Sequence, residues 1–117
     1  MNERQLNADF AQRCAVDSNT LPWITSPSPL VHRRLLERNG GEVARATSVV
    51  RYAVGARFDS HRHDLGEEIF VVEGVFSDEH GDYPQGSWLR SPHLSQHQPF
   101  SREGCLILVK TGHLLDA

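Results

Sequence analysis

The stretch from Gly55 to Gly74 reads GARFDSHRHDLGEEIFVVEG and combines two closely spaced histidines with an acidic residue and an apolar run. His61 and His63 are two residues apart, so on a β-strand both imidazoles project from the same face. Side chains at that spacing can converge on one metal ion, about 2 Å from each nitrogen. Glu67 follows the segment DLG, which can turn the next strand back toward the same point. An isolated histidine pair is also typical of a polar sheet face, so the pair alone leaves both interpretations open.

The apolar run after these residues predicts a strand that is covered on both faces. Glu67, Ile69 and Val71 point to one face of such a strand, and Phe70 and Val72 point to the other. Both faces are therefore largely apolar. A second sheet, the N-terminal segment or a subunit partner is expected to cover the second face.

Short strands separated by turns account for most of the chain after the proline-rich segment PWITSPSP (residues 22–29). The predicted strands, rich in β-branched or apolar residues, are residues 44–54, 68–76, 87–92 and 105–110. The connecting segments are rich in Gly, Asn, Asp and Pro, which is typical of turns. This pattern predicts an all-β barrel or sandwich.

The N-terminal segment has a different pattern. Leu6 and Phe10 recur at helical spacing, but three prolines in residues 22–29 exclude that segment from a helix interior. We therefore expect an N-terminal arm over residues 1–21, partly helical or flexible, ahead of a single β domain over residues 22–117.

Composition excludes several classes of protein. The 117 residues are 38% hydrophobic and 23% charged with a formal net charge of -3, which fits a soluble domain without the clustered positive charge of a nucleic-acid-binding protein. The most basic run, HRRLLER (32–38), is interpreted as a solvated edge beside a few buried leucines. No apolar run is long enough to span a membrane, and no secretory signal is visible, so a cytoplasmic location is expected. Cys14 and Cys105 are then expected to be reduced.

The spacing of the opening stretch matches a known motif. Gly55, His61, His63, Glu67 and Gly74 fit G(X)5HXH(X)3,4E(X)6G, the first motif of the cupins, at every position. The chain therefore resembles a cupin.

A second motif follows in the expected order. The cupin pattern G(X)5PXG(X)2H(X)3N resembles GSWLRSPHLSQHQPFS (86–101), in which Pro92 and His97 are in place. Leu94 stands where the family has glycine and Ser101 where it has asparagine, which puts the local turn geometry in question. The phrases GEE, EGVFSDEHGDYPQG and EGCLILVK are most similar to the cupin domain of the ChrR anti-sigma factor and to small stand-alone relatives. The resemblance covers about residues 22–112.

The resemblance implies a single-domain cupin β-barrel, jelly-roll-like in topology, with one divalent metal ion held by His61, His63, Glu67 and His97. Glu68 is the alternative carboxylate, since the motif also allows four intervening residues. Cupins of this kind usually pair, so a homodimer is implied, with room for a small molecule in the barrel and no role for nucleic acid or a membrane.

The identity of the metal separates two functions. Zinc with four protein ligands leaves little room for chemistry, so the site would then be structural or sensory, as in a regulatory module of the ChrR type. Iron, nickel or manganese leaves two further positions, and the site is then similar to those of cupin dioxygenases, with Glu67 able to act as a base.

Other residues have weaker claims. Gln96 and Gln98 flank His97 and could orient a ligand or a water molecule, although exposed amides are the commoner outcome. Some of the large apolar residues are expected to line a cavity while most form the core: Phe58, Phe70, Val72, Trp88, Leu89 and Ile107. The remaining histidines, His32, His80, His93 and His113, lack ligand spacing and are interpreted as structural or solvated.

A complete anti-sigma factor of the ChrR type is not expected, because its helical zinc domain would need more ligands than Cys14 and His32.

Overall fold

Antiparallel strands form nearly all of the regular structure in the computed structural model, which describes residues 4–40, 44–59 and 61–114, without the side chains of residues 4, 44, 61 and 62. The strands are β1 (Arg4–Leu6), β2 (Ile24–Thr25), β3 (Val31–Gly40), β4 (Ala44–Tyr52), β5 (His61–His63), β6 (Glu67–Asp78), β7 (Gly81–Pro84), β8 (Trp88–Ser91), β9 (Ser95–His97) and β10 (Cys105–Thr111). Within these ranges the helical structure is one 3-10 turn, Ser18–Thr20, and no helix there is long and apolar enough to cross a membrane.

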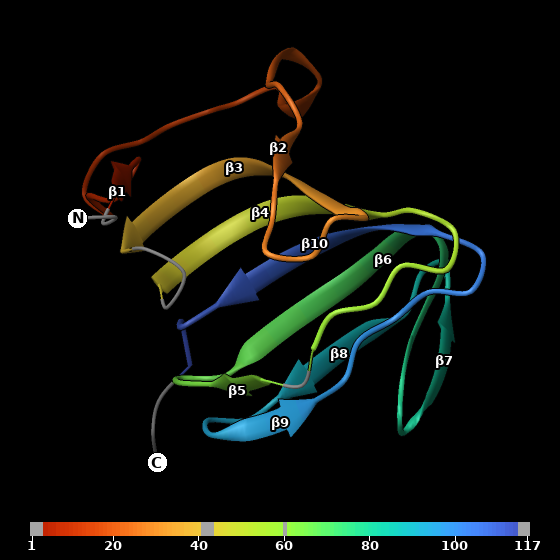
Figure 1. Cartoon of the computed structure of the whole chain (residues 1–117). Coiled ribbons are helices and arrows are strands. Elements are labelled where there is room, and N and C mark those ends of the chain that lie inside the picture. The colour runs from red at the N-terminus through yellow and green to blue at the C-terminus, as the bar shows by residue number, and fades with distance from the viewer. Residues whose placement is uncertain (1–3, 41–43, 60, 115–117) are drawn as a thin grey trace.

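Eight of the strands share one curved sheet. Its order is β1-β3-β4-β10-β6-β7, with β2 added beside β3 and β8 beside β6. β5 and β9 form a separate two-stranded pair. Figure 1 shows β3, β4, β10 and β6 as the neighbouring long strands, with β5, β8 and β9 along the other edge of the molecule. The four predicted strands correspond to β4, β6, β8 and β10 to within a few residues.

β3 was not among the predicted strands, and the interpretation of its residues 32–38 as a solvated edge is wrong. The strand pairs with β4 along nearly its whole length, and Arg38 within it is only 6% exposed. The alternation that would have revealed a strand is broken, because the register with β4 shifts between Leu35 and Glu37. This shift is a β-bulge that leaves Leu36 without a partner residue on β4.

The bulge exchanges the faces of the residues that follow it. Strict alternation from Arg33 would turn Glu37 inward and Arg38 outward. Instead Arg38 lies opposite Ala46 and faces the interior, whereas Glu37 contacts Thr47 and His113 on the outer side. Because Leu36 has no partner on β4, the cationic Arg38 faces the interior and the acidic Glu37 faces outward.

The core lies on the concave side of the large sheet. Alternate residues of the central strands are buried there, and Tyr52 packs edge-to-face against Phe76 with ring centroids 5.7 Å apart. The buried cluster is Val31, Val50, Tyr52, Ala56, Ile69, Val71, Phe76, Cys105 and Ile107. Cys105 thus behaves as a small core residue, while Cys14 is exposed, and both are free thiols.

The two faces of β6 differ in exposure. Glu67, Ile69 and Val71 are buried, as the alternation predicted, but Phe70 is 43% exposed and Trp88, opposite it on β8, is 56% exposed. Within the single chain the outer face of β6 is therefore open over these residues. The N-terminal segment does not cover it, since β1 pairs with β3 at the other side of the sheet. The boundary predicted between residues 21 and 22 stays a prediction.

Candidate metal site

The β5–β9 pair brings the two histidine motifs together. In its antiparallel register His61 pairs with His97, and His63 pairs with Ser95. The side chain of His61 lies outside the described residues, so its assignment as a metal ligand stays a prediction. The β5–β9 pairing thus brings His63 of the first motif next to His97 of the second, although the two are 34 residues apart in the sequence.

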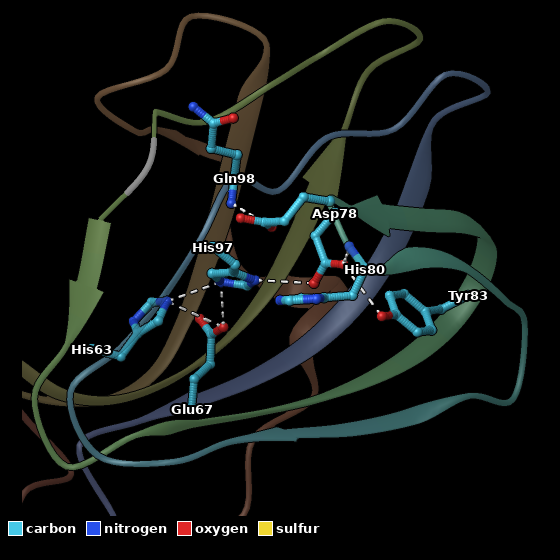
Figure 2. Close-up of polar contacts among 8 residues, drawn as sticks. His63, Glu67, Asp78, His80, Tyr83, His97 and Gln98 are labelled. Atoms are coloured by element: carbon cyan, nitrogen blue, oxygen red, sulfur yellow. Dashed lines mark hydrogen bonds and ion pairs between the residues drawn. The ribbon is translucent and has the colours of Figure 1, made fainter.

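Three buried side chains converge on one point. The Nε2 atoms of His63 and His97 are 3.0 Å apart, and Oε1 of Glu67 lies 3.3 Å from the first and 3.0 Å from the second. Figure 2 shows the two rings and the carboxylate pointing toward one another. Two ligand atoms that each lie about 2.1 Å from a shared ion are roughly 3.0–3.4 Å apart. The spacing of these three atoms therefore fits a divalent metal ion.

The carboxylate of Glu67 gives a second sign of fit. Its Oε1 is buried and receives no hydrogen bond of good geometry, although two ring nitrogens lie within 3.3 Å. A buried carboxylate oxygen without a hydrogen bond is costly unless a cation compensates it. Two imidazoles and a carboxylate are a common donor set for zinc, iron and related ions.

A tight turn delivers Glu67 to the site. His63 ends β5 and Glu67 begins β6, and the turn between them is closed by the Gly66 N–H, which donates to the carbonyl of His63 at 3.2 Å. Gly66 has φ of 72°, a left-handed conformation that glycine adopts without strain. The sequence DLG thus turns the chain as predicted and returns the carboxylate toward the ring of His63.

Asp78 orients His97 from the side away from the other ligands. Its Oδ2 lies 3.3 Å from Nδ1 of His97, so the neutral ring donates from Nδ1 and presents a lone pair on Nε2. The other oxygen of Asp78 accepts from the His80 backbone N–H at 2.8 Å and from the Tyr83 hydroxyl at 3.2 Å (Figure 2). The sequence analysis missed Asp78, which lies in the quoted phrase EGVFSDEHGDYPQG but at no recognisable ligand spacing.

The carboxylates also change the proton affinity of His97. Burial lowers the pKa of the ring, but the neighbouring carboxylates of Glu67 and Asp78 outweigh burial and raise the pKa above its ordinary value. The same negative environment that attracts a proton attracts a metal ion.

The family model for the ChrR cupin-like domain matches residues 11–115. The chain belongs to this family. The predicted fold, a single cupin β-barrel domain, is confirmed by the strand topology and by solved cupin structures of the same architecture. No curated protein matches the chain.

Solved cupins share this fold at low sequence identity. The anti-sigma factor ChrR from Rhodobacter sphaeroides, solved in complex with SigE, is 23% identical with a TM-score of 0.67, and the match covers 80% of this chain and 50% of that one. This cupin thus spans half the length of the ChrR chain. An acetylacetone dioxygenase from Acinetobacter johnsonii is 16% identical with a TM-score of 0.68, covering 86% and 72%. KdgF from Halomonas sp. is 19% identical with a TM-score of 0.66, covering 86% and 94%.

The second cupin motif keeps its turn despite the replacement of glycine. Ser95 N–H donates to the carbonyl of Pro92 at 3.0 Å, and Leu94, at the third position of this turn, has φ of 69°. That position favours glycine in turns of this kind. Leu94 N–H also donates to the carbonyl of His63 at 2.9 Å, which fastens the turn to the metal site.

Other predicted candidates lie outside the cluster. Glu68 faces outward and pairs with Arg90, with Nε and Oε2 2.9 Å apart, so Glu67 is the carboxylate at the site.

Gln96 and Gln98 are exposed, and in Figure 2 the side chain of Gln98 points away from His97. His93 accepts a hydrogen bond from the Leu65 N–H at 2.8 Å. His80 is exposed, and His113 contacts Glu37.

The cluster opens onto a cavity of about 330 Å³ inside the curved sheet. His63, Glu67 and His97 form part of its wall. Most of the remaining wall is apolar: Val31, Val50, Phe58, Ile69, Phe76, Pro99, Ile107 and Val109. Of the large apolar residues considered in the sequence, Phe58 and Ile107 line the cavity, whereas Phe70 and Trp88 are exposed on the outer face.

Proposed function

We propose that this cupin holds one divalent metal ion with His61, His63, Glu67 and His97 and acts on a small molecule bound beside it, as a dioxygenase-like enzyme. The observation that carries the proposal is the position of the three described ligands in the wall of an apolar cavity. A purely structural ion needs no adjoining space, whereas a ligand pocket needs a volume of about 300 Å³ or more.

The protein side chains have separate roles in this proposal. A bound metal would supply Lewis acidity and, if it is iron, nickel or manganese, a redox centre. Asp78 keeps the Nε2 lone pair of His97 directed at the ion. Glu67 lines the cavity and would act as a base by leaving the ion and accepting a proton from the bound molecule. The apolar wall keeps bulk water from the reacting atoms.

Oxygen consumption tests this activity. The metal-free protein is loaded separately with iron, nickel and manganese and offered diketones, hydroxyketones and flavonols, while an oxygen electrode follows uptake. We expect uptake with at least one combination, and its loss in Glu67→Gln. The matched control is Glu68→Gln on the outer face, which should retain activity. Fully loaded protein that consumes no oxygen across the panel contradicts the proposal.

A non-catalytic zinc module is the second candidate. The match to the ChrR cupin-like family model over residues 11–115 favours it, as does the structural likeness to ChrR, which was solved bound to SigE. Elemental analysis of protein purified from its own host separates the two. Stoichiometric zinc whose coordination is filled by protein atoms alone, measured by X-ray absorption, supports the zinc module.

A homodimer is also proposed, since the outer face of β6 and β8 exposes Phe70, Val72 and Trp88. A partner subunit would cover the outer face of β6, which the strand pattern predicts to be buried. Sedimentation velocity tests this. Trp88→Ser should shift a dimer toward monomer, whereas Leu30→Ser, at an exposed residue just before β3, should not.

A further inference from the structure

The buried hydroxyl side chains of the described residues fall into two pairs. Ser77 and Ser101 lie outside the cavity, and each donates its hydroxyl to an acceptor inside the protein. Ser48 and Tyr52 are each 5% exposed and line the cavity, and neither hydroxyl forms a hydrogen bond with a described residue. The buried hydroxyls that lack a protein partner are thus the two that belong to the cavity wall.

This difference indicates what the cavity can bind. Burying a hydroxyl without a hydrogen bond is costly, and most buried polar groups in proteins have a partner. Tyr83, the second tyrosine of the chain, follows this rule, since its hydroxyl donates to Asp78 at 3.2 Å. A molecule that enters the cavity can supply the acceptor that the described protein groups do not offer to Ser48 and Tyr52.

The backbone places both hydroxyl residues on one wall. Ser48 and Tyr52 are four residues apart on β4, so their side chains leave the same face of the strand, with Val50 between them. Ile107 lies opposite Val50 on β10 and lines the cavity too. The wall therefore combines an apolar surface with a hydroxyl residue on each side of it.

Packing holds the ring of Tyr52 close to the candidate metal site. Its neighbour Phe76 is fully buried, and the ring centroid of Phe76 lies 5.7 Å from that of Tyr52 and 6.4 Å from that of His97. Burial raises the pKa of Tyr52 well above its ordinary value, and the negative charge of Glu67 adds to this effect. The hydroxyl therefore keeps its proton at neutral pH and can donate to a molecule beside the proposed ion.

We propose that the cavity selects a small molecule with an apolar body and an accepting oxygen atom, such as a ketone, which receives hydrogen bonds from Tyr52 and Ser48. The body would pack against Val50 and Ile107. A site built to hydrogen-bond an oxygen atom discriminates against an analogue that lacks it, because the buried hydroxyls then stay unpaired. This inference rests on the proposed function, because it names the class of molecule that the metal would meet.

Titration with acetophenone and its hydrocarbon isostere α-methylstyrene tests the inference on the zinc-loaded protein, in which the ion supplies no redox chemistry. Protein chemical shifts report both dissociation constants. We expect the double variant Tyr52→Phe with Ser48→Ala to bind acetophenone at least about fivefold more weakly than the wild type, and to bind α-methylstyrene no more weakly. Each single variant should lose part of that selectivity. Thr47→Val is the matched control, because it removes a hydroxyl from the outer face of the same strand.

Stability gives a second readout. Removing an unpaired buried hydroxyl should not destabilise the fold, so the urea midpoints of Tyr52→Phe and Ser48→Ala should be no lower than that of the wild type. Ser77→Ala, which loses a hydrogen-bonded hydroxyl, should have a lower midpoint.

Three results would overturn the inference: a lower midpoint in Tyr52→Phe or Ser48→Ala, binding of neither probe, or unchanged acetophenone binding in the double variant because the oxygen sits on zinc alone. Selective binding of acetophenone without any oxygen consumption contradicts the proposed activity but leaves this inference standing.

Discussion

His97 is a buried imidazole whose two nitrogens face two different acids. Oε1 of Glu67 lies 3.0 Å from Nε2, and Oδ2 of Asp78 lies 3.3 Å from Nδ1. The first acid shares the proposed metal with the ring, and the second fixes the tautomer that makes Nε2 a ligand. The two acids therefore contribute to the site in different ways.

Replacing Asp78 tests whether its contact with Nδ1 of His97 supports metal binding. We expect Asp78→Asn to lower zinc affinity about 10- to 100-fold, because the ring loses the negative partner that orients it. Chelator competition measures the affinity. Glu79→Gln is the control, since Glu79 is exposed and accepts from the Gln98 N–H at 3.0 Å instead of contacting Nδ1 of His97. An equal loss in both variants would mean that general negative charge, and not the contact with Nδ1, is responsible.

Leu94 adopts a conformation that suits glycine better. Its φ of 69° is costly for a residue with a Cβ atom, and its side chain is 50% exposed, so little packing would be lost on its removal. We expect Leu94→Gly to raise the free energy of unfolding by roughly 1 kcal/mol. Urea denaturation measures the change. Leu94→Ala keeps the Cβ and should give no such gain, and a gain in both variants would contradict the argument from strain.

Local strand and turn geometry predicted that His63 and Glu67 lie close together, and the resemblance to the second cupin motif predicted His97. Asp78 could not be predicted in the same way. It reaches His97 from a different strand, nineteen residues away, and only the fold brings the two together. The departure at Leu94 raised a question that the sequence could not settle, and the structure shows that the left-handed turn is kept.

On the outer side of β3, Glu37 links neighbouring elements. Its Oε2 accepts from the Thr47 hydroxyl and lies 2.6 Å from Nε2 of His113 beyond β10. Burial by itself would raise the pKa of Glu37. The contacts with Thr47, His113 and Arg45 more than offset that effect and leave the pKa below its ordinary value of 4.5.

This shift predicts a pH-dependent contribution to stability. Because the pKa is lower in the folded state, Glu37 stabilises the fold fully above the unfolded value of 4.5, and the contribution is lost as the pH falls through the folded value. We expect Glu37→Gln to be less stable than the wild type at pH 7, with the difference shrinking below pH 4.5. Urea denaturation from pH 7 to pH 3 measures it. Thr47→Val, which removes one donor, should show a smaller loss, and a difference independent of pH would contradict the assignment.

Continuous runs of β-branched or apolar residues make strands visible in the sequence. β4 and β10 contain such runs and were predicted to within two residues. β3 was missed because its apolar and charged residues change face at Leu36, so its pattern resembles neither a helix nor a strand. A bulge arises from pairing with another strand, which a single sequence does not display.

The whole molecule should respond to metal, because the proposed ligands come from β5, β6 and β9 and meet only in the folded chain. We expect chelation to lower the Tm by roughly 10 °C relative to protein with free zinc at about 100 times its Kd. Differential scanning calorimetry measures the shift. His97→Ala should lose the response to zinc, whereas His93→Ala, outside the cluster, should keep it. An unchanged Tm after verified metal removal would count against the site.

At this scale the sequence predicted the fold class through two motifs in order, but not the interior of the barrel. The charges that face the cavity depend on pairing registers across β3 and β4, and Arg33 and Arg38 lie outside both motifs. The outer face of β6 shows the converse. Its apolar residues were visible in the sequence, and Phe70 and Val72 stay exposed in the single chain.

The unpaired Leu36 also divides β3 into two stretches of opposite parity. Before Leu36 the odd-numbered Val31 and Arg33 face the cavity, and after Leu36 the even-numbered Arg38 faces it. A mutational library that randomised every second position through the whole strand would therefore reshape the pocket with one half of its changes and the exterior with the other. A library that targets the cavity therefore has to vary odd-numbered positions of β3 before Leu36 and even-numbered positions after it.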